Sequence, residues 1–330
     1  MSDTTTAWIA HAGREPRDTF SAEQVPLPHL RPRDLLVRIR AVSVNPVDLK
    51  VLSRLGEGES RQLGYDASGV VEAVGDQVTS FGPGDAVYYS GDVTRPGTNT
   101  ELHAVDERIV ARKPVNLDWA EAAALPLTTI TAWESLFDHL HLAHDTTGPL
   151  LIVGGAGGVG SIMIQLAKAL TGVTVIATAG RDESRDWVRH LGADQVVGHA
   201  NLVDEVIAIA PEGVNWIFSS FTPGNIGAYA QLLRPFGHIV AVDDDPGPIG
   251  VLKTKSISFH WEYMFARVMH LTPDVEQQGH LLARAAELIE QAQVRSTLTN
   301  AIDGIGPATL AQAHDLVRSG RSIGKTVLTL

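Results

Sequence analysis

The chain has no cysteine among its 330 residues. This absence excludes disulfide bonds, zinc sites built from thiolates and cysteine nucleophiles. No apolar run approaches the roughly 18 residues that a membrane-spanning helix needs, and the N-terminal sequence MSDTTTAWIAHAGREP lacks the pattern of a secretory signal. We therefore expect a cytoplasmic protein with no membrane partner.

Positive charge is also scarce. The chain has 26 Lys and Arg against 38 Asp and Glu, which gives a net charge of −12, and its basic residues form no cluster that would bind a phosphate backbone. Nucleic acid is therefore not an expected partner. A hydrophobic content of 44% and this length are typical of a globular protein of two domains.

Two patterns of secondary structure divide the chain. Up to about residue 112, short strands such as TTAWIAH, LLVRIRAVSV and DAVYY alternate with turns, which indicates an antiparallel barrel or sandwich. From Pro126, buried strands such as LLIVGG and VTVIATA alternate with helices, which is typical of a doubly wound parallel sheet. The tail has two short pieces and one helix, too little for a core of its own. We therefore predict an α/β protein whose first domain comprises residues 1–124 and 272–330 and whose second comprises 125–271.

The stretch LLIVGGAGGVGSIMIQLAKAL carries the clearest motif. Gly155, Gly157 and Gly160 fit G-x-G-x-x-G directly after a strand and before a helix. Such glycines allow a tight turn, close approach of the backbone to a pyrophosphate and tight helix packing, with the helix N-terminus facing the anion. The motif predicts dinucleotide binding. The alternative is a glycine turn beside an empty crevice.

The end of the next strand bears on the choice of nicotinamide. An NAD site usually has an acidic residue there for the adenosine ribose, but ATAGRDES places Ala179 and Gly180 at this point, followed by Arg181. A small residue leaves room for a 2′-phosphate and an arginine can pair with it, so we predict NADPH. Alternatively, Arg181 is a solvated loop residue and Asp182 holds the ribose of NAD.

Nearly the whole chain resembles the medium-chain dehydrogenase/reductase superfamily. The resemblance rests on SVNPVDLK, LGYDASGVVEAVG, FGPGDAVYYSGDVTRPGTNTE, VDERIVARKP, LPLTTITAW, ATAGRDES, SFHWEYMFAR and GKTVL. Within it the chain resembles the quinone oxidoreductase branch, and most closely the zinc-type alcohol dehydrogenase-like proteins. This resemblance implies a GroES-like β-barrel catalytic domain, a Rossmann domain, an active cleft between them and a homodimer.

The resemblance also locates the catalytic zinc of other members. Its ligand positions fall on Asn45, Tyr65 and about Leu127, none of which is a zinc ligand, and a short cysteine-free segment near VTRPGTNTE replaces the structural-zinc lobe. We therefore predict no metal. Two further clusters are weaker candidates: His141 and His144 on a helical face, with His139 pointing elsewhere, and the acidic run 243–245, which a solvated loop explains better.

A metal-free site favours a particular reaction. Alcohol oxidation forms an alkoxide that zinc normally stabilises as a Lewis acid. Hydride transfer from NADPH to a quinone, or to the β-carbon of an enone or enal, needs only hydrogen-bond donors and a proton for the oxyanion. We therefore predict a zinc-independent NADPH-dependent reductase of small-molecule quinones or α,β-unsaturated carbonyls. The alternatives are a zinc-type alcohol or aldehyde dehydrogenase and a non-catalytic NADPH-binding protein.

Three residues are the candidate catalytic groups. The Asn45 amide would orient the substrate or the nicotinamide ribose, or else it caps the following helix. Lys50, where some relatives carry a proton-relay histidine, would stabilise an enolate, or else it is a surface lysine. Tyr65 would donate a proton or a hydrogen bond, or else it is a packed aromatic. Asp48 and Asp66 are predicted to brace this loop.

Further residues complete the predicted site. Four aromatic side chains are expected to form a flat apolar substrate pocket, although each taken alone is more often a core residue: Tyr88, Phe259, Trp261 and Phe265. The predicted cofactor-binding residues are Asn45, Thr131, Gly155, Gly157, Gly158, Val159, Gly160, Thr178, Arg181, Ser219, Val242 and Lys325.

Overall fold

The computed structural model describes residues 3–13 and 18–330. The chain divides into two compact units. Unit 1 comprises residues 1–130 and 265–330, and unit 2 comprises residues 131–264. The sequence placed these boundaries after residues 124 and 271. In the structure the first one lies within helix α3 (Pro126–Trp133).

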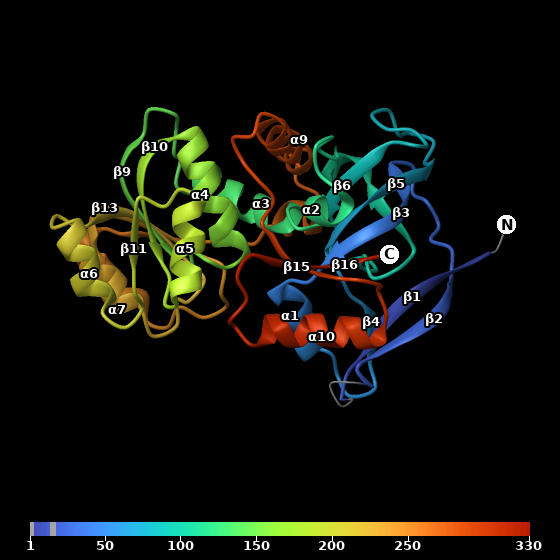
Figure 1. The fold of residues 1–330 in the computed structure, drawn as a ribbon, viewed down its shortest axis with the longest axis horizontal. Helices are drawn as coiled ribbons and strands as arrows, with labels where there is room; N and C mark the ends of the chain where they lie inside the picture. The colour runs from blue at the N-terminus through green and yellow to red at the C-terminus, as the bar shows by residue number, and fades with distance from the viewer. Residues whose placement is uncertain (1–2, 14–17) are drawn as a thin grey trace. The chain divides into compact units, whose positions relative to one another are not determined.

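Unit 1 is built from two β-sheets (Figure 1). A three-stranded sheet has the order β2-β1-β4, and a seven-stranded sheet has the order β15-β16-β3-β5-β6-β8, with β7 also paired to β3. Apart from the parallel pair β15 and β16, all of these pairs are antiparallel. The strands are β1 (Thr4–His11), β2 (Phe20–Pro26), β3 (Asp34–Ser43), β4 (Ser60–Gln62), β5 (Asp66–Val74), β6 (Ala86–Ser90), β7 (Leu102–Asp106), β8 (Val110–Arg112), β15 (Leu298–Ile302) and β16 (Lys325–Thr329).

Short helices connect these strands. Helix α1 (Pro46–Ser53) follows β3, the 3-10 turn η2 (Glu107–Ile109) separates β7 from β8, and α2 (Trp119–Ala123) precedes α3. From the sequence alone, ELHAVDERIV (residues 101–110) is predicted to be one strand, because it contains no Gly or Pro to mark the turn η2.

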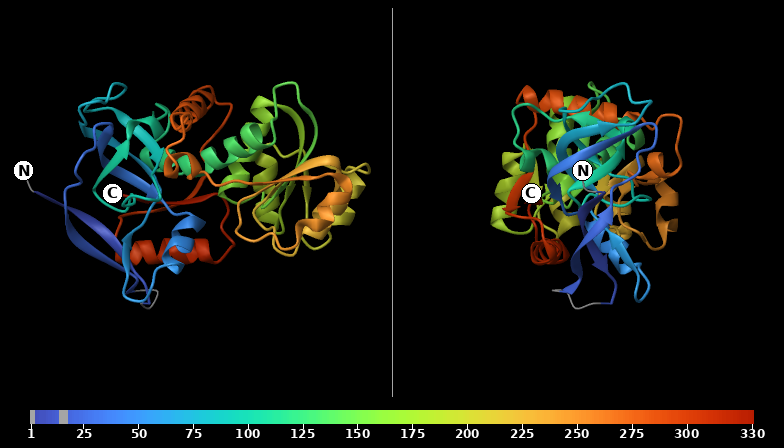
Figure 2. Two further views of the ribbon diagram at one scale, coloured as in Figure 1. Left: turned by 180° about the vertical axis from the view of Figure 1, so that it is seen from behind. Right: turned by 90° about the vertical axis from the view of Figure 1, so that its right-hand side faces the viewer.

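The C-terminal tail, residues 265–330, belongs to unit 1. Strand β16 pairs with β3, so residues from opposite ends of the sequence lie side by side (Figure 2). The prediction of a single helix was wrong. After α8 (Ala266–Met269) come two long helices, α9 (Gln277–Glu290) and α10 (Pro307–Arg318). Pro307 at the first position of α10 was the available signal.

Unit 2 is a six-stranded parallel sheet of order β11-β10-β9-β12-β13-β14. Helices α4 to α7 connect its strands (Figure 1), which confirms the predicted α/β class. Its elements are η3 (Glu134–His139, a π-helix), β9 (Thr147–Val153), α4 (Gly158–Leu170), β10 (Gly172–Thr178), α5 (Asp182–His190), β11 (Gln195–Val197), α6 (Leu202–Ile209), β12 (Val214–Ser219), α7 (Ile226–Leu232), β13 (Leu233–Ala241), η4 (Ile249–Lys255) and β14 (Ser258–Trp261).

The strand order of unit 2 explains its sequence pattern. Strand β9 lies between β10 and β12, and Leu150, Leu151 and Ile152 are fully buried in it. A strand covered by helices on both faces reads as a continuous apolar run rather than an alternating one. From β9 the chain adds β10 and β11 on one side and then β12 to β14 on the other, so the strand order reverses at β9. Ligands of such sheets bind at this point, beyond the carboxyl ends of the strands.

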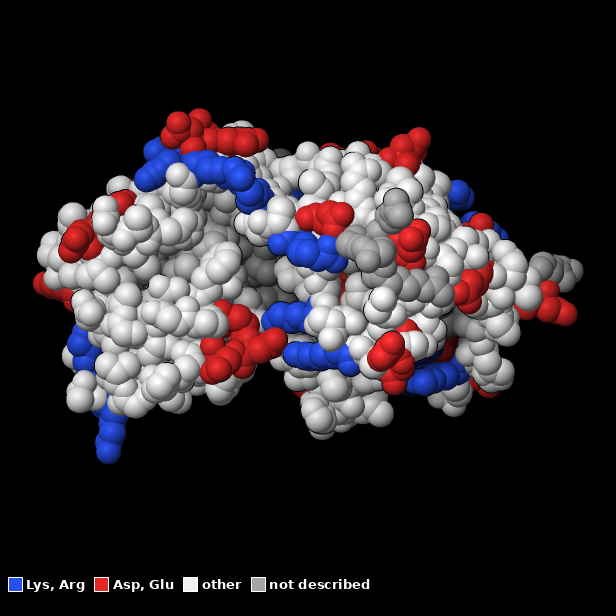
Figure 3. All heavy atoms as spheres, turned by 90° about the horizontal axis from the view of Figure 1, so that it is seen from below, with Lys and Arg blue, Asp and Glu red and all other residues white. Residues whose placement is uncertain are grey.

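The charged side chains on the surface are mixed. On the face drawn in Figure 3, Lys and Arg form small groups between Asp and Glu side chains. Among the described residues, no helix has both the length and the apolarity needed to cross a bilayer.

His314 in α10 gives a testable pH effect. The imidazole is buried against Phe20, and both of its nitrogens lack a hydrogen-bond partner among the described residues. Burial, together with the nearby charge of Arg318, lowers its pKa to about 4. Unfolded histidine titrates near 6.5, so the unfolded chain binds more protons between pH 6.5 and 4. Through His314, the free energy of unfolding should therefore fall by about 1.4 kcal/mol for each unit by which the pH is lowered in this range.

The test is urea denaturation of wild-type protein and His314→Leu at pH 7, 6 and 5. We expect the difference between the two free energies of unfolding to grow in favour of His314→Leu as the pH falls. A difference that stays constant across this range would contradict the assignment.

Candidate functional site

The glycine loop connects β9 to α4 in unit 2. Gly154 follows the strand with φ +88°, a left-handed conformation that favours glycine, and α4 begins at Gly158. The first N–H groups of a helix have no partner within the helix, so the N–H groups of Gly158, Val159 and Gly160 form an anion site at this helix N-terminus. Trp187 donates from Nε1 to Ser161 Oγ at 2.9 Å and holds α5 against this turn.

The three motif glycines differ in the space around them. A Cβ on Gly160 would lie 2.4 Å from the Gly154 carbonyl oxygen, and one on Gly155 would lie 2.8 Å from Ala177 Cβ. The fold itself therefore requires these two glycines. A Cβ on Gly157 would lie 3.4 Å from its nearest neighbour, the Gly154 oxygen, which is an ordinary contact. The protein leaves the space beside Gly157 open, as the approach of a pyrophosphate requires.

Thr178 at the end of β10 fixes this loop. Its buried Oγ1 accepts a hydrogen bond from Gly154 N at 2.9 Å, and its carbonyl accepts one from Gly155 N at 3.2 Å. These bonds give Thr178 a positioning role, whereas the sequence predicted direct cofactor binding.

The residues after Thr178 are the predicted 2′-phosphate site. Ala179 is buried, Gly180 and Arg181 are exposed, and Arg181 immediately precedes α5. A Cβ on Gly180 would lie 3.3 Å from His199 Cδ2, so His199 lies beside it. Burial lowers the pKa of His199, and the nearby charge of Arg185 lowers it further. The sequence does not single out His199, because only the fold brings it to Gly180.

The other predicted cofactor residues of unit 2 lie at strand ends or in α3. Ser219 ends β12, where its buried Oγ lies 2.9 Å from the Tyr229 hydroxyl, and Val242 N donates to its carbonyl. Thr131 is buried in α3, and its carbonyl accepts a bond from Ser135 Oγ at 2.7 Å. Asp243 accepts a bond from Thr222 N, so its carboxylate fixes a loop in the acidic run 243–245.

In unit 1, Asp66 is the centre of a fully buried polar cluster. Its Oδ2 accepts hydrogen bonds from Ser43 Oγ at 2.6 Å and Asn45 Nδ2 at 2.8 Å, and its Oδ1 accepts one from Leu127 N at 2.7 Å. Lys325 Nζ lies 3.5 Å from Oδ2. This carboxylate ties together β3, β5, α3 and β16, which goes further than the predicted bracing of one loop.

The geometry of Lys325 does not support direct cofactor binding. Its Nζ donates to the Val44 carbonyl at 3.0 Å, to Asn45 Oδ1 and to Asp66, and these three bonds use all its protons. The side chain is 4% exposed, and burial lowers the pKa of its ammonium group. Lys325 therefore acts on the site by holding Asn45 and Asp66.

Asn45 immediately precedes α1, and its amide is largely committed to the protein. Lys325 occupies its oxygen and Asp66 accepts from its nitrogen, which leaves one amide N–H for a ligand. Its backbone N–H donates to Asp48 Oδ2 and Gly64 N donates to Asp48 Oδ1, both at 2.8 Å. Burial raises the pKa of Asp48 to about 7, although these two bonds act in the opposite direction. Asn45 therefore caps α1 through its backbone, whereas its side-chain amide bonds to Lys325 and Asp66.

Tyr65 and Lys50 occupy different surroundings. Tyr65 is fully buried, and its ring packs edge-on against Phe265 with the centroids 5.4 Å apart. Lys50 is half-buried and lines a cavity of about 540 Å³ together with His11 and Arg318. Neither Asn45 nor Tyr65 lines that cavity.

The four predicted pocket aromatics do not share one environment. Tyr88 is a core residue: it is fully buried, and its hydroxyl donates to the Leu282 carbonyl of α9 at 2.5 Å. Phe265 is buried against Tyr65. In unit 2, Phe259 packs on the core, and Trp261, 52% exposed, contacts it edge-on at 4.9 Å. For Tyr88 the alternative of a core residue is the one the geometry supports.

The positions that resemble zinc ligands converge but do not fit zinc. Asp66 links Asn45 to Leu127, and Tyr65 precedes Asp66 in the chain. The side chains at the three positions are an amide, a phenol and a hydrocarbon, whereas zinc sites use imidazole, thiolate and carboxylate. The buried ammonium group of Lys325, bonded to Asn45 and Asp66, would also repel a dication. We therefore assign no catalytic step to a metal here.

The histidine-rich segment 138–145 differs from its prediction. The helix ends at His139, and His141 has φ +53°, so His141 and His144 do not share a helical face. His139 Nε2 lies 2.9 Å from Glu262 Oε2. Within residues 3–13 and 18–330, no three His, Asp or Glu side chains are arranged to hold a metal ion.

Comparison with known proteins identifies the family. Residues 31–114 match the alcohol dehydrogenase GroES-like domain and residues 158–260 match the zinc-binding dehydrogenase family. A zinc-type alcohol dehydrogenase-like protein of Staphylococcus aureus is 41% identical over 306 residues, which cover 90% of this chain and 91% of that protein. An NADPH-dependent alkenal/one oxidoreductase of Arabidopsis thaliana is 29% identical over 315 residues, 92% of this chain and 73% of that protein.

A solved structure agrees over the full length. A Rhizobium etli CFN 42 protein assigned as a zinc-dependent alcohol dehydrogenase superposes with a TM-score of 0.95 at 44% identity, and the match covers 100% of this chain and 99% of that one. The glycine loop, the domain order and these similarities lead to one conclusion: the chain belongs to the medium-chain dehydrogenase/reductase superfamily.

Proposed function

We propose that this protein is an NADPH-dependent oxidoreductase that reduces quinones or α,β-unsaturated carbonyls without a catalytic zinc. The observation that carries the proposal is that the positions resembling zinc ligands hold Asn45, Tyr65 and Leu127, whose side chains do not bind zinc. A buried cluster with Asp66 and the ammonium group of Lys325 holds the Asn45 amide in place. An NAD(P)-dependent oxidoreductase that lacks this Lewis acid is best suited to acceptors that delocalise charge themselves.

The glycine loop and the end of β10 support NADPH. The N–H groups at the start of α4 would bind the pyrophosphate, and the space beside Gly157 admits it. Arg181 follows Gly180 in the chain, His199 lies beside Gly180, and the charge of Arg185 acts on His199; an NAD site would carry a carboxylate at this strand end. When bound, NADPH supplies the hydride. The Arabidopsis relative named as an NADPH-dependent alkenal/one oxidoreductase is consistent with this choice.

The chain's own contribution at the acceptor is polar. Hydride addition to the β-carbon of an enone moves an electron pair to the carbonyl oxygen, and a proton must then reach the α-carbon. We propose that the remaining N–H of Asn45 and the hydroxyl of Tyr65 stabilise that oxyanion. Lys325 and Asp66 would hold the Asn45 amide in a fixed orientation, so that no reorganisation is needed during the reaction.

The test is turnover of protein dialysed against a chelator. NADPH absorbance should fall when cyclohexenone or a para-quinone is added. Arg181→Ala should weaken the binding of NADPH by about tenfold or more and leave the binding of NADH almost unchanged. Arg189→Ala, which removes an exposed arginine paired with Asp186 on the same helix, is the control. Activity that appears only with an alcohol, NAD and added zinc would overturn the proposal in favour of an alcohol dehydrogenase.

A further inference from the structure

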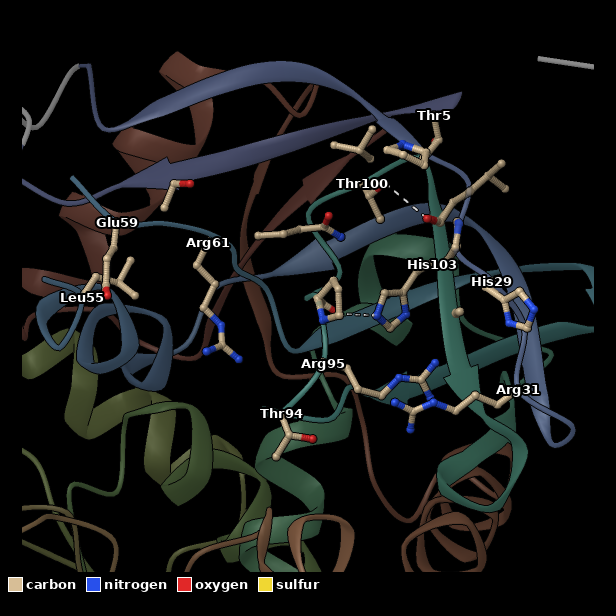
Figure 4. A pocket seen from close by; sticks show the side chains of 18 residues that line it. Thr5, His29, Arg31, Leu55, Glu59, Arg61, Thr94, Arg95, Thr100 and His103 are labelled. Atoms are coloured by element: carbon tan, nitrogen blue, oxygen red, sulfur yellow. Dashed lines mark hydrogen bonds between the residues drawn. The ribbon is translucent and has the colours of Figure 1, made fainter. Parts of the chain in front are cut away.

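Unit 1 contains a large cavity outside the site described above. Its volume is about 880 Å³, within the range typical of ligand pockets. The walls come from β1, β2, β4, β7 and the loops beside them (Figure 4). None of the residues predicted for catalysis or cofactor binding lines it.

The charge of this cavity is opposite to that of the chain. Arg31, Arg61 and Arg95 line it together with His29, and among the described residues Glu59 is the one acidic residue in its walls. The whole chain has 38 acidic residues against 26 Lys and Arg. Three guanidinium groups beside one carboxylate therefore set this cavity apart from the rest of the surface.

Two of these guanidinium groups have no carboxylate partner in the part of the chain that the structure describes. Arg95 donates to both oxygens of the buried Asp34, at 2.9 and 2.7 Å, so its charge is compensated. Arg61 donates to the neutral Val93 carbonyl, and among the described residues neither Arg61 nor Arg31 forms a side-chain ion pair. Their charges remain available to a ligand.

Asp34 also fixes the position of Arg31. The Oδ2 atom of Asp34 accepts a hydrogen bond from the backbone N–H of Arg31 at 3.0 Å as well as one from the Arg95 side chain. Arg31 and Arg95 therefore belong to the same wall, and both lie near His103 in Figure 4. The His103 ring is held between the Tyr89 hydroxyl and the Pro96 carbonyl at 3.0 Å each, and burial lowers its pKa to about 4. The neutral ring adds rigidity to this wall without adding charge.

The remaining walls are largely apolar. Val25, Pro26, Pro28, Leu55 and Leu102 line the space beside the arginines. Guanidinium groups recognise carboxylates and phosphates through paired hydrogen bonds, and apolar walls accommodate a hydrocarbon body. We propose that this cavity binds a small organic anion, a carboxylate or phosphate monoester with an apolar body, through Arg31 and Arg61. The proposal does not depend on the hydride-transfer function.

Calorimetric titration of the full chain with octyl phosphate and octanoate tests this binding site. Both anions should bind, and octanol should bind at least tenfold more weakly. Added salt should weaken the binding of the anions because it screens the arginines. Each titration is repeated with saturating NADPH. Binding that survives NADPH belongs to this cavity, whereas binding that NADPH removes belongs to the glycine loop and would overturn the proposal.

Variants locate the ligand. Arg31→Gln and Arg61→Gln should each weaken the binding of octyl phosphate by about tenfold. Arg40→Gln removes one exposed positive charge of unit 1 outside the cavity and should leave this binding unchanged. Circular dichroism checks that all three fold. If all three variants bound octyl phosphate with equal affinity, or if neither anion gave a heat of binding, the proposal would be overturned. Binding to phosphatidic acid vesicles but not to octyl phosphate would also overturn it, in favour of a membrane surface.

Discussion

Replacing Lys325 with methionine is expected to lower the free energy of unfolding by about 3–5 kcal/mol, the cost of breaking a buried ion pair from one side. Methionine matches the length of the lysine stem but removes the ammonium group from Val44, Asn45 and Asp66. The fully buried Asp66 carboxylate would then lose the one cationic group that lies within hydrogen-bond reach of it among the described residues. Urea denaturation of the two proteins measures the difference.

Lys168→Met is the matched control for this experiment. Lys168 pairs with Asp194 at 2.9 Å, but both side chains are about one-third exposed. Exposed pairs contribute roughly 0–1 kcal/mol, so this variant should stay close to wild type. The double variant Lys325→Met, Asp66→Asn should recover part of the loss, because it removes the uncompensated charge. A loss below about 1 kcal/mol for Lys325→Met would refute the role given to the cluster.

Gly157→Ala is expected to separate cofactor binding from folding. Gly157 has φ −73°, which alanine adopts readily, and its Cβ would meet no atom closer than 3.4 Å. Stability should therefore change by no more than about 0.5 kcal/mol. The added methyl group would occupy the space proposed for the pyrophosphate, so NADPH should bind at least about tenfold more weakly, a loss of roughly 1.4 kcal/mol or more. Fluorescence titration with NADPH measures it.

Two other glycines serve as comparisons. Gly160→Ala should lose both stability and binding, because its Cβ would lie 2.4 Å from a backbone oxygen and 2.7 Å from Gly155 Cα. Gly227→Ala in α7, which has open space around it, should not weaken binding. If Gly157→Ala bound NADPH as tightly as wild type, the pyrophosphate would not lie against this loop.

The parts of the site that the sequence predicted are local ones. The glycine loop, its strand and its helix lie within about 24 consecutive residues, 147–170, and apolar periodicity with glycine spacing is enough to recognise them. The buried cluster is different. Lys325 is 280 residues from Asn45 and 259 from Asp66, so only the pairing of β16 with β3 brings them together. Composition and spacing carry no signal for such a contact.

The errors have the same origin. Tyr88 was assigned to a pocket, but α9, nearly 200 positions later, supplies the carbonyl that buries its hydroxyl. The sequence does not single out Arg31 or Arg61, because their shared cavity depends on the arrangement of four strands. The helix predicted through His141 ended earlier, since a left-handed φ at that residue is not visible in residue type.

The interleaving of early and late strands in unit 1 constrains its biogenesis. Unit 2 is one continuous stretch, so a ribosome can release all of its residues in succession and the nascent chain can collapse there first. Unit 1 stays unfinished until β16 has been synthesised, because that strand lies between β15 and β3 and brings the ammonium group that neutralises Asp66. Until β16 has been synthesised, β3 lacks this partner strand, so we expect residues 1–130 to depend on chaperones for longer than unit 2 does.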